Sequence, residues 1–178
     1  MRELLTDCLW KNFGAAIDML KNAIVLCPDE IWQNDKKFYY LTYHTTIFLD
    51  YYLTSPVKDF NPNLPYTITD LSELPPEAVD DVIPNQFYSK DEFLIYLSAI
   101  REKCKRLITE ASEGKLQSRW IDDAEIEMHG LCASIVVNYN VLEILFYNLR
   151  HVQHHTAQLN LILRQKANVA ADWISHAS

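Results

Sequence analysis

The sequence predicts an all-α protein, a four-helix bundle with a long proline-rich connection between its second and third helices. Four stretches repeat apolar residues at spacings of three and four, the period of a helix with one buried face. Only three glycines occur in the 178 residues, which favours long helices over tight hairpins. With 49% hydrophobic and 22% charged residues, the composition is that of a globular protein. We expect a single domain over residues 1–178.

The first predicted helix covers residues 2–26 and ends before Pro28, because proline disfavours the helical conformation of the residue that precedes it. A short link follows, and the second helix covers residues 36–53. Its expected inner face is rich in aromatic residues and contains one histidine. That face consists of Tyr40, Leu41, His44, Ile47, Phe48 and Tyr51.

Residues 54–88 interrupt the helical pattern and contain six of the seven prolines. A connection this long without secondary structure is unusual in a compact domain. In a helical bundle, such a connection allows the next helix to run parallel to the previous one. Its apolar residues can pack on the bundle, and we do not interpret it as a domain boundary.

The third helix has a clear start, since Ser89 and Glu92 form a capping box, and we expect it to end near residue 112. Residues 114–137 give no decisive pattern. Trp120 and the acidic cluster of Asp122, Asp123 and Glu125 look exposed. The fourth helix is predicted from Asn140, with Glu143 as a second capping signal, to about Gln165. The tail from Ala167 to Ser178 contains Trp173, which can fold back as a cover.

The bulk properties exclude some functions and locations. The net charge of −8 argues against nucleic acid as a partner, because phosphate binding needs clustered Lys and Arg. No apolar run is long enough for a membrane span, and the charged N-terminal stretch does not resemble a signal peptide. The four separated cysteines are typical of free thiols in a reducing compartment. We therefore expect a cytoplasmic protein with no membrane partner.

Three histidines are the candidate metal ligands. His151 and His155 are four residues apart, so that they share one face of the fourth helix and can bind the same ion. Asn148 and Gln158 lie on that face too, and cores rarely place several polar side chains in a row without using them. His44 lies in the apolar stripe of the second helix. Bundle cores commonly hold metals through facing side chains, but a lone core histidine is more often a packing residue.

The segment Leu149–Arg164, LRHVQHHTAQLNLILR, resembles the last-helix signature H-x-x-x-H-x-x-Q of the DinB-like superfamily. That family also carries one histidine on its second helix, matched here by the segment Thr42–Phe48, TYHTTIF. The resemblance implies an up-down-down-up bundle and a divalent metal, zinc or nickel, held by three histidines. Carried over residue by residue, these ligands are His44, His151 and His155.

Two features of this sequence depart from that pattern or lie outside it. His154 matches no ligand of the family. Many relatives have Arg directly after the second histidine of the pair, where this chain has Thr156. A role that depends on a cation at that position is therefore not carried over.

The resemblance implies a metal-dependent enzyme, with a thiol-dependent S-transferase as the first hypothesis. The metal would activate a low-molecular-weight thiol, which is transferred to a small electrophilic substrate. Three imidazoles leave coordination positions open, as in catalytic sites. Asn148 and Gln158 can support the ligands from an outer shell, or they are polar fillers that pair with each other or with ordered water.

Two alternatives remain at this point. A metal-dependent hydrolase needs a general base, and no Asp or Glu lies clearly on the histidine face. A non-enzymatic, stress-related metal-binding bundle needs no catalytic residue beyond the ligands. The oligomeric state cannot be read from the sequence, but dimers are common among such bundles and a homodimer is one expectation.

Overall fold

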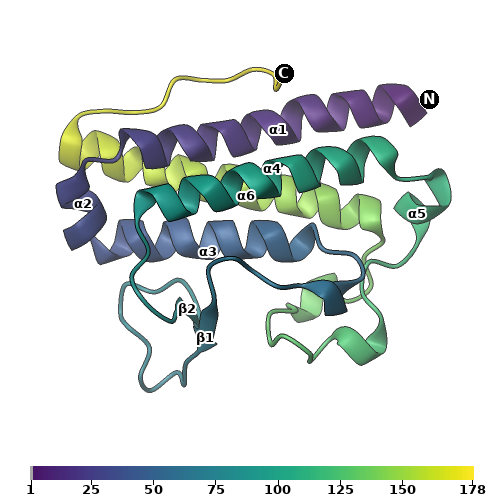
Figure 1. The fold of residues 1–178 in the computed structure, drawn as a ribbon, viewed down its shortest axis with the longest axis horizontal. Coiled ribbons are helices and arrows are strands. Elements are labelled where there is room, and N and C mark those ends of the chain that lie inside the picture. Colours follow the sequence, from purple (N-terminus) through teal and green to yellow (C-terminus); the bar gives the residue numbers. More distant parts are fainter. Residues whose placement is uncertain (1) are drawn as a thin grey trace.

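The computed structural model describes residues 2–178, which are mostly helical, in agreement with the predicted all-α class. Four long helices lie side by side (Figure 1). They are α1 (Arg2–Leu26), α3 (Lys36–Tyr52), α4 (Lys90–Glu110) and α6 (Val141–Ala167). Helix α1 packs on α4 and α6, and α3 packs on the same two helices. In Figure 1, α1 and α6 run in one direction and α3 and α4 in the other.

Helix α3 is the most enclosed element of the molecule. Every residue from Leu41 to Tyr52 is buried, including His44 and Asp50. A helix that is buried on all sides belongs to the centre of a protein, and this one is covered by α4, α6 and the connection that follows it. A polar side chain in the middle of α3 is therefore shielded from solvent.

The predicted helix starts are confirmed. Ser89 and Glu92 form a reciprocal capping box at the start of α4, and Asn140 and Glu143 form one at the start of α6. Each box satisfies backbone N–H groups that have no partner inside the helix. Helix α6 ends at Asn168, whose φ of 55° is the left-handed conformation in which helices commonly end.

The link after the first helix contains a short helix that the sequence pattern did not reveal, α2 (Asp29–Asn34). Its anchor is Trp32, which is buried in edge-to-face contact with Phe38 and Phe93. The indole N–H of Trp32 donates to the backbone carbonyl of Tyr88 at 3.2 Å. Six residues are too few for a helical period to be visible, so tertiary packing defines this helix.

The proline-rich connection is folded against the helices. It holds a two-stranded antiparallel sheet of β1 (Tyr66–Ile68) and β2 (Val82–Pro84), with Thr67 opposite Ile83. A 3-10 turn, η1 (Val57–Asp59), comes before it. Strand β2 packs on α3, and Val82 is buried. The connection thus lies along the helix that carries His44 (Figure 1).

The stretch between α4 and α6, whose conformation the sequence left open, contains three short helical turns. These are α5 (Glu113–Gln117), η2 (Asp123–Glu125) and η3 (Ser134–Val136). The expectation that Trp120 and the whole acidic cluster are exposed was wrong, because Trp120 and Glu125 are buried. The Trp120 indole donates to the carbonyl of Thr54 at 3.0 Å, and Glu125 accepts from the N–H of Lys58 at 2.8 Å.

The C-terminal tail runs back along α1, as the N–H of Ala177 donates to the carbonyl of Lys11 at 2.9 Å (Figure 1). Trp173 does not act as a cover, since 74% of its surface is exposed. The tail instead approaches α1 at Gly14, where an added Cβ would lie 2.5 Å from the Cβ of Ala177. Gly14 therefore allows close contact between tail and helix.

Candidate metal centre

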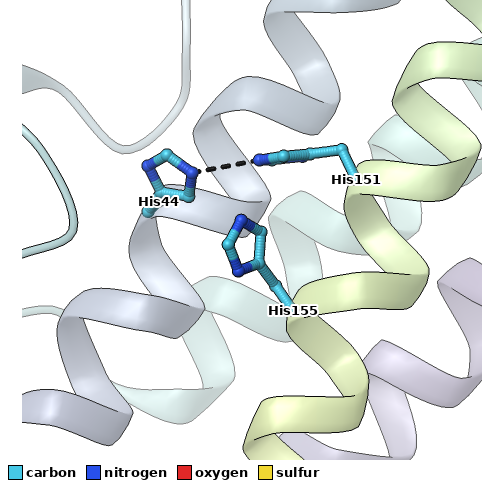
Figure 2. A group of neighbouring side chains, drawn as sticks. All are labelled: His44, His151 and His155. Carbon is cyan, nitrogen blue, oxygen red and sulfur yellow. Dashed lines mark hydrogen bonds between the residues drawn. The ribbon is translucent and has the colours of Figure 1, made fainter.

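The structure brings His44, His151 and His155 together. One ring nitrogen of each lies within 4.8 Å of the others. Nε2 of His44, on α3, is 3.0 Å from Nε2 of His151, on α6, and the ring of His155 points toward the same space (Figure 2). His44 and its two partners come from the two helices that the sequence predicted to carry them.

The packing of α3 on α6 explains why the three rings meet. His151 and His155 are one helical turn apart on α6, and their ring centroids are 4.5 Å from each other. The amide of Asn148, one turn before His151, donates to the carbonyl of Leu49 on α3 at 2.9 Å. This hydrogen bond joins α3 and α6 beside the histidines and so fixes the position of one helix along the other.

The environment keeps two of the rings neutral. Burial, together with the neighbouring His44 and His155, lowers the pKa of His151 to about 2. Burial also lowers the pKa of His155 to about 4, against the opposing effect of its hydrogen bond to Gln158. Near neutral pH, both rings therefore have a free lone pair, as metal coordination requires.

Gln158 orients the ring of His155. Its amide oxygen lies 2.7 Å from Nδ1 of His155. A carbonyl oxygen can only accept, so the ring proton lies on Nδ1 and the lone pair lies on Nε2. Figure 2 shows that the nitrogen far from the backbone of α6 faces the other two histidines.

Asn148 has a different place from the one expected of an outer-shell partner. It is completely buried, and its hydrogen bond goes to α3 rather than to an imidazole. Its Oδ1 atom is buried without a hydrogen-bond partner, and the same holds for Nδ1 of His151. Within residues 2–178, Asn148 thus contributes to helix packing beside the triad and makes no contact with a histidine ring that qualifies as a hydrogen bond.

Asp80 is a neighbour of the triad that sequence reasoning missed. Its Oδ2 atom lies 2.9 Å from Nδ1 of His44, although the approach is outside the angles of a hydrogen bond. Asp80 comes from the proline-rich connection, and no helical period relates it to His44. The only signal in the sequence was general: a long acidic connection in a compact domain often carries function.

The other histidines stay outside the cluster. His154 is exposed on α6, as expected of a residue that matches no ligand, and Nε2 of His129 lies 3.0 Å from the carbonyl of Val57. Asp50 on α3 is buried. It accepts from the hydroxyl of Tyr96 at 2.6 Å and from Nζ of Lys103 at 2.7 Å.

A cavity of about 320 Å³ opens beside His44 and His151. Aromatic rings and acidic residues line it, and none of the lining residues is Lys or Arg. Its lining includes Phe48, Tyr52, Asp80, Asp81, Cys132 and Tyr147. A small organic molecule fits a volume of this size.

The three rings have the properties of a metal site. They supply three nitrogen donors, two of them with depressed pKa values. The 3.0 Å between the two Nε2 atoms is close to the roughly 3.3 Å expected for two nitrogens that bind one tetrahedral zinc ion at 2.0–2.1 Å. The triad can therefore hold a metal ion. Comparisons of the chain with protein-family models, curated proteins and solved structures gave no match.

Proposed function

We propose that this protein is a metal-dependent enzyme of the DinB-like type, a thiol-dependent S-transferase that acts on a small electrophile. The observation that carries the proposal is the convergence of His44, His151 and His155 next to a cavity. Three protein ligands leave positions for a further ligand, which is the arrangement of catalytic rather than structural sites.

The proposal includes the bundle topology. Up-down-down-up order places the second and third long helices parallel to each other and requires a long connection between them. The directions of α3 and α4 in Figure 1 and the length of the connection support this order. The packing of α1 and α3 on the same two partners, α4 and α6, supports a bundle of four helices.

His44, His151 and His155 would hold a divalent ion, zinc or nickel, since imidazole suits both metals. When bound, the ion makes a thiolate available near neutral pH by lowering the pKa of a coordinated thiol. In the transfer reaction, the thiol sulfur would form a bond to the electrophilic carbon of the substrate, the leaving group would depart with its electron pair, and the thiol proton would pass to solvent. Phe48, Tyr52 and Tyr147 supply apolar walls for the substrate, and the burial of His44 restricts water on one side of the triad.

The thiol is a co-substrate in this proposal. Each of the four cysteines of the chain is free. Burial raises the pKa of Cys132, the one that lines the cavity, so its thiol is poorly ionised. A low-molecular-weight thiol from solution therefore suits the role better than Cys132.

A metal-dependent hydrolase is the second candidate, and one observation favours it. A hydrolase needs a general base, and the sequence showed no Asp or Glu clearly on the histidine face. In the structure, Asp80 and Asp81 both line the cavity. Asp80 faces His44, which leaves Asp81 as the candidate general base for a water molecule. A non-enzymatic metal-binding protein is the remaining alternative.

One experiment separates the three functions. The protein is loaded with zinc or nickel and mixed with glutathione or cysteamine and 1-chloro-2,4-dinitrobenzene, and the thioether is followed by absorbance. Hydrolysis of p-nitrophenyl acetate is measured in parallel. Metal-dependent thioether formation that is lost in His151→Ala supports the transferase. Hydrolysis alone supports the second candidate, and metal binding without either reaction supports the third. A protein that binds no metal at all would overturn both enzyme proposals.

We further propose that the protein is cytoplasmic, acts on small molecules and binds neither nucleic acid nor membranes. The acidic charge of −8 supports the absence of nucleic acid. No helix within residues 2–178 combines the length and the hydropathy of a membrane span. A homodimer is the proposed assembly. Light scattering of the protein as it elutes from a size-exclusion column measures the molar mass and tests this proposal.

A further inference from the structure

We propose that Asp80 is a positioning residue of the metal centre. Its carboxylate holds the ring of His44 with Nε2 toward His151 and His155, and it thereby couples the proline-rich connection to metal binding. This inference rests on the proposed metal site and adds a residue from outside the helices to it.

The Asp80 carboxylate has a defined place in the fold. Its Oδ1 atom accepts from the N–H of Val82 at 3.1 Å, and Val82 is buried as the first residue of β2. The pairing of β2 with β1 and its packing on α3 fix the backbone there. The other oxygen, Oδ2, remains for His44, 2.9 Å from its Nδ1 atom.

The chemistry of the contact decides which nitrogen of His44 can bind a metal. An ionised carboxylate only accepts hydrogen bonds, so a neutral His44 ring beside Asp80 carries its proton on Nδ1. The lone pair then lies on Nε2, which is the atom that faces His151 at 3.0 Å. Nδ1 of His44 is buried without a hydrogen-bond partner within the described chain, and the Asp80 carboxylate is the charged group beside it.

The present angle between the two groups is compatible with this role. The Asp80 side chain is partly exposed, so it has room to rotate, whereas the side chain of His44 is buried. A carboxylate behind a metal-binding histidine fixes the ring and increases its basicity.

The same contact links two parts of the fold. A metal ion that holds His44 in place also favours the position of Asp80, and hence of the turn that leads into β2. Because such coupling is reciprocal, an ordered connection favours metal binding by the same free energy. The long connection then has a function in the site beyond joining α3 to α4.

Asp80→Ala and Asp80→Asn test the inference, with Asp81→Asn as the matched control. Asp81 lines the same cavity, and its loss removes one negative charge as well. Zinc affinity is measured by competition with a chelator, and the absorption spectrum of the Co²⁺-loaded protein reports the ligand geometry. We expect Asp80→Ala to lose about 10- to 100-fold in affinity, the usual cost of an outer-shell partner, and to change the cobalt spectrum. Asp80→Asn, which keeps an acceptor oxygen, should lose less.

Hydrogen exchange provides the second readout. Zinc should increase the protection of residues 78–84 in the wild type and in Asp81→Asn, but not in Asp80→Ala. The thermal midpoints of the metal-free variants show whether the fold is intact. If Asp80→Ala does not fold, the comparison uses Asp80→Asn, because this variant preserves the size of the side chain.

The outcomes distinguish this inference from the proposed function. Wild-type affinity in both Asp80 variants would overturn the positioning role and leave the metal site intact. An equal loss in Asp81→Asn would also overturn it, because the effect would then come from charge alone. If the wild type binds no metal, the proposed function and this inference both fail.

Discussion

Nε2 of His44 and Nε2 of His151 lie 3.0 Å apart, although 107 residues separate them along the chain. Two nitrogen lone pairs at this distance repel each other unless a proton or a metal ion lies between them. A hydrogen bond from one ring to the other satisfies this condition, and so does a metal ion that binds both nitrogens. Each ring is fixed by its own helix, so the pair is prepared for an ion before the ion arrives.

Removal of any triad histidine should abolish tight metal binding. His44→Ala, His151→Ala and His155→Ala each leave two nitrogen donors, and we expect affinity losses above the roughly 100-fold limit for an outer-shell partner. His154→Ala is the control, since this exposed neighbour lies outside the group of three. Metal analysis and circular dichroism check the result. A variant that loses metal and fold together would point to a structural site.

Gln158→Ala should weaken metal binding by about 10-fold, the lower end for an outer-shell partner. The variant lacks the oxygen that lies 2.7 Å from Nδ1 of His155 and holds the ring tautomer. The exposed Gln165 on the same helix provides the control substitution, Gln165→Ala. Chelator competition gives both affinities, and equal values for the two variants would contradict the orienting role of Gln158.

Tyr96→Phe should lower the free energy of unfolding by about 1.5–3 kcal/mol, the range for a hydrogen bond to a charged group. Its hydroxyl donates to the buried carboxylate of Asp50 at 2.6 Å, and burial raises the pKa of Tyr96. Chemical denaturation measures the change, with Tyr40→Phe, at a half-buried position of α3, as the control. Metal affinity should be unchanged, so a loss of metal binding in Tyr96→Phe would contradict a purely structural role for this pair.

Gly14→Ala should displace the C-terminal tail, because the new Cβ would lie 2.5 Å from the Cβ of Ala177. Alanine is also better than glycine in a helix by about 1 kcal/mol, so the global stability should change little. Hydrogen exchange of residues 169–178 should increase. A second substitution, Ala177→Gly, should restore the protection, and an unchanged exchange rate in the single variant would mean that the tail does not rest on α1.

Glu125 should contribute stability that depends on pH. Burial raises the pKa of its carboxyl, but hydrogen bonds from the backbone N–H groups of Asp122 and Lys58 outweigh this effect, so that the pKa is lowered in the folded protein. The stabilisation is complete above the unfolded-state value of about 4.5 and is lost as the pH falls through the lower folded-state value.

Glu125→Gln should therefore unfold more easily at pH 7, by about 1.5–3 kcal/mol, and approach the wild type under acid conditions. Denaturation curves from pH 7 to below 4.5 measure this convergence, with the exposed Glu127→Gln as the control. A constant difference between wild type and Glu125→Gln over the whole range would contradict the assigned ionisation.

Features that depend on local spacing follow from the order of the residues alone. The four long helices follow from apolar periodicity, and the starts of α4 and α6 follow from capping boxes formed by residues three apart. The common face of His151 and His155 also follows from the geometry of one helix. These interactions lie within a few residues of each other, so the order of side chains is enough to predict them.

The contacts between distant segments depend on the tertiary fold. The approach of His44 to His151, the contact of Asp80 with His44 and the burial of Asp50 and Glu125 join residues from separate elements. A polar residue has the same appearance in a sequence whether it faces water or a buried partner. Its environment is set by the packing of α3 between its neighbours and by the fold of the proline-rich connection, which no local period describes.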